Sequence, residues 1–214
     1  MVGGALWLLY PRQDLERRLA QDDSPLSTAY LNNLLRSDSD NPRLRLLLAQ
    51  RQAAEGELEQ VRKTLQPATA STNEQLHRDA VWTLWSATYN KYEKTPAENK
   101  AARDALHREL LQQLNALVQE DWPQEKEQQL TRQAFLLGAR TEGIALLRGQ
   151  AAREQQADKA ALLYESAARE ALAVSNYSLT ADLYLLARQS TPDAQTAKKH
   201  FLSAVAAMQS SGNT

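Results

Sequence analysis

The chain has 214 residues, enough for one ordinary domain or a short repeat array with a buried core. Its 25 Lys and Arg balance 26 Asp and Glu to a formal net charge of −1, which disfavours nucleic-acid binding because no overall field attracts phosphate. The absence of Cys excludes disulfides, thiolate metal sites and thiol nucleophiles. With 35 Leu and 34 Ala against 6 Val and 1 Ile, the composition predicts an all-α protein.

The first ten residues form an apolar segment, because positions 2–10 carry no charge before Pro11. The segment is too short to span a bilayer, which takes about 20 apolar residues. One interpretation is a terminal helix packed on the rest of the chain. The other is the remnant of a membrane anchor, with Trp7 and Tyr10 at the interface.

Four proline residues follow a side chain that commonly caps helices, and each pair predicts a helix start. The pairs are Ser24-Pro25, Asn41-Pro42, Thr95-Pro96 and Thr191-Pro192. Between them the apolar residues recur at helical spacing, which predicts about ten helices joined by short loops.

Two stretches, 42–75 and 161–194, carry small and large residues at matching offsets around a turn at Gly56 or Ser175. We expect a tight, left-handed turn at Gly56. The offsets resemble the tetratricopeptide repeat, a helix-turn-helix of about 34 residues. The resemblance implies a solenoid of helical hairpins.

The middle of the chain departs from this period. Helical segments are expected at 74–94, 97–120, 124–139 and 142–155, and the first two are too long for the ordinary repeat. The predicted organisation is therefore an apolar segment at 1–10, N-terminal repeats at 11–75, an irregular helical middle at 76–160 and C-terminal repeats at 161–214.

Both ends of the predicted array look incomplete. The first helix of a degenerate N-terminal unit is expected around Leu15–Leu19. At the other end, Phe201 to Met208 form the first helix of a further repeat, followed by a turn at Gly212-Asn213. We therefore expect the array to be truncated.

No motif in the sequence indicates catalysis. His77, His107 and His200 lie on different predicted helices without the spacing of a zinc site. Carboxylates such as Glu125 and Glu142 lie in polar stretches that give no sign of a cleft. We expect no catalytic residue, cofactor or metal.

A binding surface is expected on the first helix of each repeat, which lines the concave face of such arrays. The predicted partner-binding residues are Arg43, Leu46 and Gln50 from the earlier repeat and Glu165, Arg169 and Leu172 from the later one. For the charged residues, the alternative is that they serve solubility alone.

Four aromatic residues, Trp82, Trp85, Tyr89 and Tyr92, share one stripe of a predicted helix. An exposed stripe could stack on sugars. Burial in the core is the favoured interpretation, since Trp is highly buried on average.

Two sequence blocks carry a second resemblance. They are WLLYP followed by SPLSTAYLNNLLRSDSDNPRLRLLLAQRQAAEGELEQVRKTL, and ALAVSNYSLTADLYLLARQSTPD. Together they resemble the N-terminal periplasmic region of the PelB-type family of Pel exopolysaccharide export proteins. In that family an inner-membrane helix leads into a tetratricopeptide array that holds polysaccharide-modifying enzymes near the export pore.

The resemblance implies a non-catalytic, membrane-anchored scaffold in the periplasm of a Gram-negative bacterium, with such an enzyme as its partner. A cytoplasmic helical-repeat adaptor with an unrelated client is the alternative, and a helical enzyme domain is the weaker third. Direct contact with polysaccharide stays open.

Overall fold

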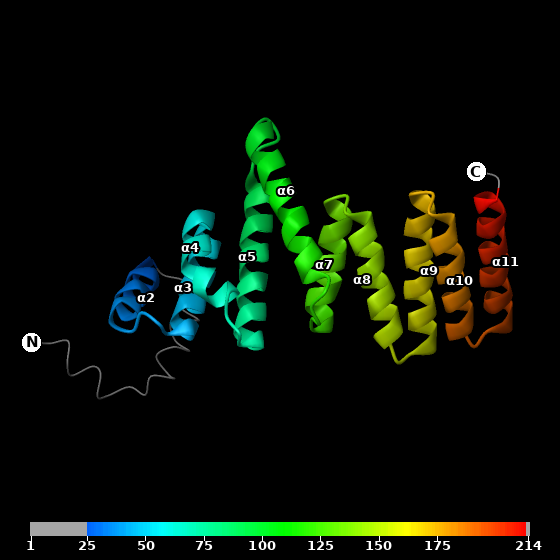
Figure 1. Cartoon of the computed structure of the whole chain (residues 1–214), viewed down its shortest axis with the longest axis horizontal. Helices are drawn as coiled ribbons and strands as arrows, with labels where there is room; N and C mark the ends of the chain where they lie inside the picture. The colour runs from blue at the N-terminus through cyan, green and yellow to red at the C-terminus, as the bar shows by residue number, and fades with distance from the viewer. Residues whose placement is uncertain (1–24, 213–214) are drawn as a thin grey trace, which may run out of the picture. The chain divides into compact units, whose positions relative to one another are not determined.

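The computed structural model describes residues 25–212, so the segment 1–10 and the helix expected around Leu15–Leu19 lie outside the described residues. Helices make up 82 % of the described residues, far above the globular average of about one third, and these residues contain no strand. The predicted all-α class is confirmed (Figure 1). The helices are α2 (Pro25–Ser37), α3 (Pro42–Glu55), α4 (Leu58–Thr69), α5 (Glu74–Lys94), α6 (Lys100–Leu117), α7 (Gln124–Leu136), α8 (Arg140–Arg153), α9 (Ala157–Ala173), α10 (Tyr177–Ser190) and α11 (Ala194–Ser211).

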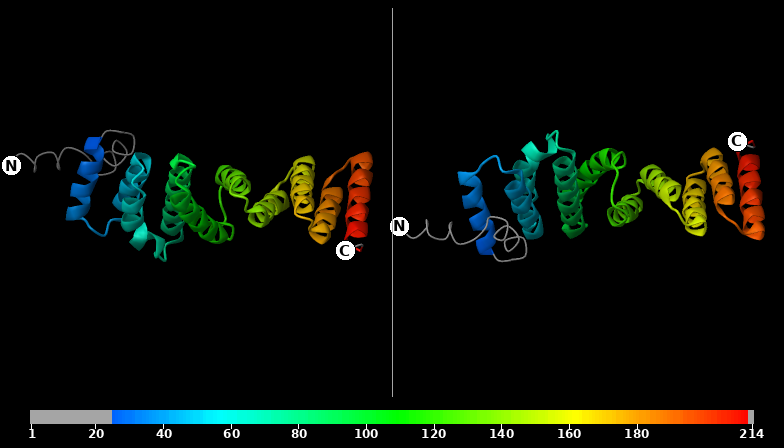
Figure 2. Two further views of the ribbon diagram at one scale, coloured as in Figure 1. Left: turned by 90° about the horizontal axis from the view of Figure 1, so that it is seen from above. Right: turned by 90° about the horizontal axis from the view of Figure 1, so that it is seen from below.

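The chain divides into two compact units, and the boundary between Leu110 and Leu111 falls inside α6. In the first unit, α3 packs against α2, α4 and α5. In the second, α9 packs against α8 and α10, and α10 packs against α11. Figure 2 shows α9, α10 and α11 standing side by side in both views.

Three pairs of helices are joined by the same kind of turn. The residue at the turn has positive φ in each case, with +81° at Gly56, +75° at Gly138 and +57° at Ser175. The expected left-handed turn at Gly56 is confirmed. The hairpin of α7 and α8, turning at Gly138, lies in the middle segment, where the sequence analysis did not single out a repeat.

The hydrogen bonds of the three turns also correspond. The residue after the turn donates its backbone N–H to the carbonyl five residues earlier, a bond that satisfies the carbonyls left open at a helix C-terminus. These bonds run from Glu57 to Gln52 (2.8 Å), from Ala139 to Ala134 (2.9 Å) and from Asn176 to Ala171 (3.0 Å).

Small buried residues lie where the two helices of each hairpin meet. They stand seven positions before the turn residue and five positions after it, and a small side chain at a crossing lets two helix backbones approach closely. The residues before the turn are Ala49, Thr131 and Ala168, and those after it are Val61, Gly143 and Thr180. Gly143 illustrates the closeness, because a Cβ there would lie 2.7 Å from the Phe135 ring.

The start of α3 is where the sequence predicts it. Asn41 caps the helix, and its side-chain oxygen accepts the backbone N–H groups of Arg43 and Leu44 at 3.1 and 3.2 Å. Pro42 occupies the first position of the helix, where its missing N–H costs nothing.

The two Thr-Pro pairs were predicted to cap helices that begin near 96 and 192. A helix does begin near 192, at Ala194, but neither threonine caps the start of a helix, and that part of the prediction was wrong. Thr95 ends α5 instead, since its hydroxyl donates to the Lys91 carbonyl at 2.6 Å, and α6 begins only at Lys100. Thr191 likewise ends α10, and Asp193 caps α11 by accepting the Thr196 N–H at 2.7 Å.

Each unit has its own apolar clusters. In the first unit, Val61 and Leu65 of α4 pack with Ala80 and Ala87 of α5. In the second, Tyr164 and Ala168 of α9 pack with Leu183 of α10. These clusters hold the first helices α3 and α9 in place, so that one face of each helix remains outside the core.

Candidate functional site

The predicted partner-binding residues of α3 divide between solvent and core. Arg43 and Gln50 are exposed. Leu46 is half-buried and packs against the cluster formed by α3, α4 and α5, so its side chain contributes to the fold. The exposed face of α3 therefore offers one cation and one amide from the predicted set.

On α9 the predicted residues form part of an ion-pair cluster. Arg169 is 67 % exposed and donates to Glu165, whose side chain is only 15 % exposed. His200 of α11 lies on the other side, with Nε2 3.5 Å from the second carboxylate oxygen of Glu165. Burial raises the pKa of Glu165, but the Arg169 guanidinium and the His200 ring outweigh it and hold the pKa below its ordinary value. Leu172 stays exposed beside the cluster.

The aromatic stripe is mainly a packing element. Trp85 and Tyr89 are buried, while Trp82 and Tyr92 are half-buried. Neighbouring rings lie close, with centroids 6.1 Å apart for Trp85 and Tyr89 and 6.5 Å apart for Tyr89 and Tyr92. For Trp85 and Tyr89 this agrees with the favoured interpretation of core packing, because a buried ring offers no face on which a sugar could stack. Trp82 and Tyr92 keep part of their surface exposed.

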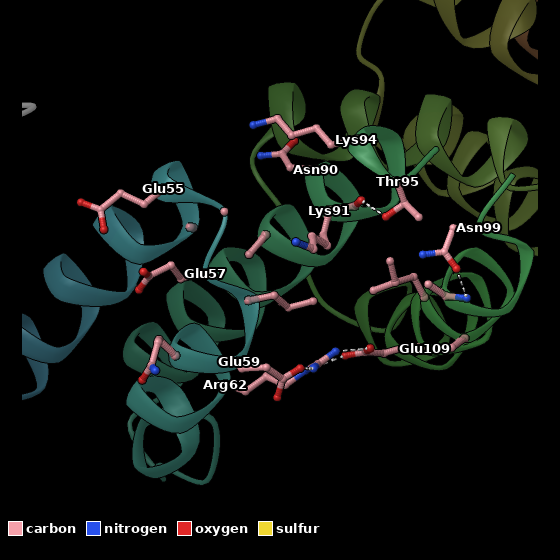
Figure 3. Close-up of a pocket in the computed structure, with 18 of the residues that line it drawn as sticks. Glu55, Glu57, Glu59, Arg62, Asn90, Lys91, Lys94, Thr95, Asn99 and Glu109 are labelled. Carbon is pink, nitrogen blue, oxygen red and sulfur yellow. Dashed lines mark hydrogen bonds and ion pairs between the residues drawn. The ribbon is translucent and has the colours of Figure 1, made fainter. Parts of the chain in front are cut away.

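A groove opens in the first unit between the turn at Gly56, α4, the end of α5 and the first part of α6. It encloses about 930 Å³, and we call it the charged groove (Figure 3). Its apolar lining residues are small or aliphatic, and they are Ala53, Leu58, Ala87, Ala102, Ala105 and Leu106.

The rim of the charged groove carries both signs of charge. Glu55 and Glu57 come from the α3–α4 end, and Lys91 and Lys94 come from the last turns of α5 (Figure 3). Both lysines are exposed, and no ion pair joins either of them to another residue of the described range 25–212. The groove suits a charged protein surface better than an apolar small molecule.

One end of the charged groove is fixed by an arginine. Arg62 of α4 pairs with Glu59 on its own helix and with Glu109 of α6, with 3.3 Å from Nε to a Glu109 oxygen. The guanidinium fork suits such bidentate pairing. This contact joins α4 to the first part of α6 at the edge of the groove.

The second unit has a pocket of about 680 Å³ formed by α7, the end of α8, the α8–α9 loop and the start of α9. We call it the glutamine pocket, because five of its lining residues are Gln124, Gln128, Gln150, Gln155 and Gln156. Its remaining lining residues are Trp122, Glu127, Arg153, Glu154, Lys159, Leu162 and Leu163.

A buried polar network supports the glutamine pocket. Glu127 of α7 is buried and accepts a bond from Arg153 of α8, and this bond raises the pKa of Arg153 against the opposing effect of burial. Gln150 donates to the Thr131 hydroxyl at 2.7 Å. These bonds join α7 to α8 and fix the position of the pocket wall.

None of the polar residues that line the two cavities is among the binding residues predicted from the sequence. The charges around Gly56 and the glutamines near 124 and 155 are visible in the sequence. Their grouping depends on which helices are neighbours, and single-sequence periodicity does not report that.

The described residues were searched for side chains that could bind a metal ion. Within 25–212, no three His, Asp or Glu side chains gather closely enough to hold a metal ion. His77 bonds to the Thr69 carbonyl at 2.8 Å, and the His107 ring lies 6.0 Å from that of Tyr92. Across the same residues, none of the helices combines the length and apolar character needed to cross a membrane.

Comparison with known proteins returned no matching family model, no matching curated protein and no matching solved structure.

Proposed function

We propose that the chain is a non-catalytic, protein-binding scaffold built from tetratricopeptide-type hairpins. The observation that carries this proposal is the recurrence of one turn in three hairpins, with small residues at equal distances on either side of it. Repetition of this kind is typical of arrays that present the faces of their first helices to a partner.

The exposed side chains suit such a role. Arg43 and Gln50 on α3, and Arg169 and Leu172 on α9, combine charge with apolar area, as protein interfaces do. The pKa shifts found among the described groups are explained by local packing and hydrogen bonds, as for Glu165.

The proposed setting is exopolysaccharide export of the Pel type in the periplasm. It rests on the resemblance of the two terminal sequence blocks to the PelB-type family. The partner proposed on this basis is a periplasmic polysaccharide-modifying enzyme that the scaffold holds near the export pore, with the chain anchored to the inner membrane.

Site-specific photocrosslinking in the source cells tests this proposal. A photoreactive residue is placed at Gln50 or Leu172, on the exposed faces of α3 and α9. Matched controls carry it at Gln66 or Asp182, which are exposed on the second helices α4 and α10.

The proposal predicts that one protein is crosslinked from the first-helix positions and not from the controls, and that mass spectrometry identifies a periplasmic polysaccharide-modifying enzyme. A cytoplasmic client would contradict the proposed setting and favour the adaptor alternative. Equal crosslinking at all four positions would contradict the proposed binding face.

A further inference from the structure

The glutamine pocket is polar, yet its charges cancel. Glu127 and Glu154 are matched by Arg153 and Lys159, and the pair of Glu127 with Arg153 is closed within the protein. A ligand of high net charge gains little from such a lining. The pocket thus differs from the charged groove in the kind of group it can select.

Four of its amides are available for hydrogen bonding. Gln124, Gln128, Gln155 and Gln156 are exposed, and their side chains make no hydrogen bond within the described part of the chain. Each amide offers two N–H donors and one carbonyl acceptor. An extended polypeptide presents the same two kinds of group alternately along its backbone.

An apolar lip completes the pocket. Leu162 of α9 is 61 % exposed, and Leu163 beside it is half-buried. An apolar side chain of a bound peptide would cover Leu162 and remove both surfaces from water. In the recognition of extended peptides, hydrogen bonds to the peptide backbone give affinity and contacts with its side chains give specificity. Here the glutamine amides would supply the first and Leu162 the second.

A glycan fits less well. Sugar binding commonly uses the open face of an aromatic ring, but Trp122 is only 6 % exposed. Its indole N–H is occupied by the Leu117 carbonyl at 2.8 Å, and the Lys126 ammonium lies 5.5 Å from the ring centroid. The pocket therefore has no free aromatic platform among its lining residues.

We propose that the glutamine pocket binds an extended, uncharged peptide segment of a protein partner, with an apolar side chain seated on Leu162. The inference rests on the proposed scaffold function and names the chemistry of one binding site. The wall formed by Glu127, Arg153 and Gln150 is held by hydrogen bonds within the chain, so this part of the site is in place before the peptide arrives.

A display library of random linear twelve-residue peptides, panned on the full chain, tests the proposal. Enriched peptides are synthesised and their Kd is measured by fluorescence anisotropy. We expect uncharged sequences with one large apolar residue, whose Kd changes less than about twofold between 0.1 and 0.5 M NaCl, because no net charge is screened.

The variant Gln128→Ala/Gln155→Ala should raise the Kd at least tenfold. The matched control Gln129→Ala/Gln189→Ala removes two exposed amides that do not line the pocket, and it should leave the Kd within twofold. Both pairs lie at exposed positions, and circular dichroism confirms that the fold is retained.

Enriched peptides that bind the Gln128→Ala/Gln155→Ala variant as well as the wild type would overturn the proposal, as would a library that yields none. Neutral oligosaccharides that displace a bound peptide would assign the pocket to glycans instead. The two proposals can fail separately. If a partner is crosslinked from Gln50 or Leu172 but binds the Gln128→Ala/Gln155→Ala variant as tightly as the wild type, the peptide-binding role of the glutamine pocket is contradicted, while the proposed scaffold function is not.

Discussion

The guanidinium of Arg103 lies over the ring of Tyr92, with its central carbon 4.3 Å from the ring centroid. From the same position, Nη1 donates to the carbonyls of Thr95 at 3.0 Å and Tyr92 at 3.4 Å. An arginine of α6 thereby bonds to carbonyls at the end of α5, of which that of Tyr92 also accepts the Thr95 backbone N–H, and it places a positive charge at that negative helix end. The contact joins two helices that border the charged groove.

Replacing Arg103 with Lys should destabilise the first unit by about 1 to 2 kcal/mol, because lysine keeps the charge but lacks the planar group that reaches ring and carbonyls together. Urea unfolding followed by circular dichroism measures the change. Arg108→Lys is the control, since Arg108 is exposed on the same helix and bonds only to the Asp104 carbonyl. Equal losses in the two variants would contradict the capping role.

Two glycines of α8 should respond oppositely to alanine. At Gly143 a Cβ would meet the Phe135 ring at 2.7 Å, an overlap expected to cost about 1 to 3 kcal/mol. At Gly149 the nearest atoms lie at 3.5 Å, so Ala is accommodated and gains up to about 1 kcal/mol of helix propensity. Thermal unfolding of the two variants tests the close crossing of α7 and α8, which equal melting temperatures would contradict.

Substitutions at two hairpin turns should change the stability in opposite directions. Gly56→Ala places a Cβ at φ +81° and should cost about 1 kcal/mol, although no atom of the described structure lies close to it. Ser175 already has positive φ, so Ser175→Gly should relieve strain and raise stability by up to about 1 kcal/mol. Chemical denaturation of both variants should show shifts of opposite sign, and shifts of the same sign would show that the two turns are not equivalent.

The Glu165 cluster predicts a dependence of stability on pH. Because the pKa of Glu165 is lower in the folded chain than in the unfolded chain, its contribution is present above the unfolded pKa and is lost as pH falls through the folded pKa. Glu165→Gln should therefore be destabilising at pH 7, by about 1 kcal/mol, and this loss should shrink as the pH falls below the ordinary pKa of a glutamate. Urea titrations of both proteins between pH 7 and 3 measure the difference, and a difference that does not change with pH would contradict the ionic role.

Helix class and much of the hairpin pattern could be predicted from the sequence, because they depend on neighbours within a few residues. Asn41 caps α3 as expected, since an Asn-Pro pair admits few alternatives. Both threonines end the preceding helix instead of starting the next one: the Thr95 hydroxyl bonds back to the Lys91 carbonyl, and the Thr191 backbone N–H bonds back to the Ala187 carbonyl. Asn99 and Asp193 supply the side-chain oxygens at the start of the next helices. Local sequence does not decide between these two uses of a threonine.

The candidate site was less predictable, because it depends on tertiary neighbours. Leu46 was placed on the binding face from its repeat position. In the structure α5 packs against α3, and Leu46 lies half-buried against the cluster formed by α3, α4 and α5. The aromatic stripe illustrates the same limit, since the spacing of Trp85 and Tyr89 shows a shared face but not which helix covers it. The two cavities follow from contacts that no local pattern encodes.

The charges of the first helices should set how the scaffold meets its partner. Once crosslinking has identified the client, its affinity for the wild type is compared with that for Arg43→Glu/Arg169→Glu at 0.05 and 0.3 M NaCl. The control Lys63→Glu/Arg148→Glu makes the same change of charge at exposed positions of the second helices α4 and α8. Circular dichroism and melting curves check that all variants remain folded, because Arg169→Glu also removes the ion pair with Glu165.

This titration is the most direct test of the scaffold account, which holds that a protein partner docks on the first helices. The account predicts that the Arg43→Glu/Arg169→Glu variant binds at least fivefold more weakly at low salt, that the difference shrinks at high salt as exposed charges are screened, and that the control binds like the wild type. Equal affinities of all three proteins at both salt concentrations would contradict it.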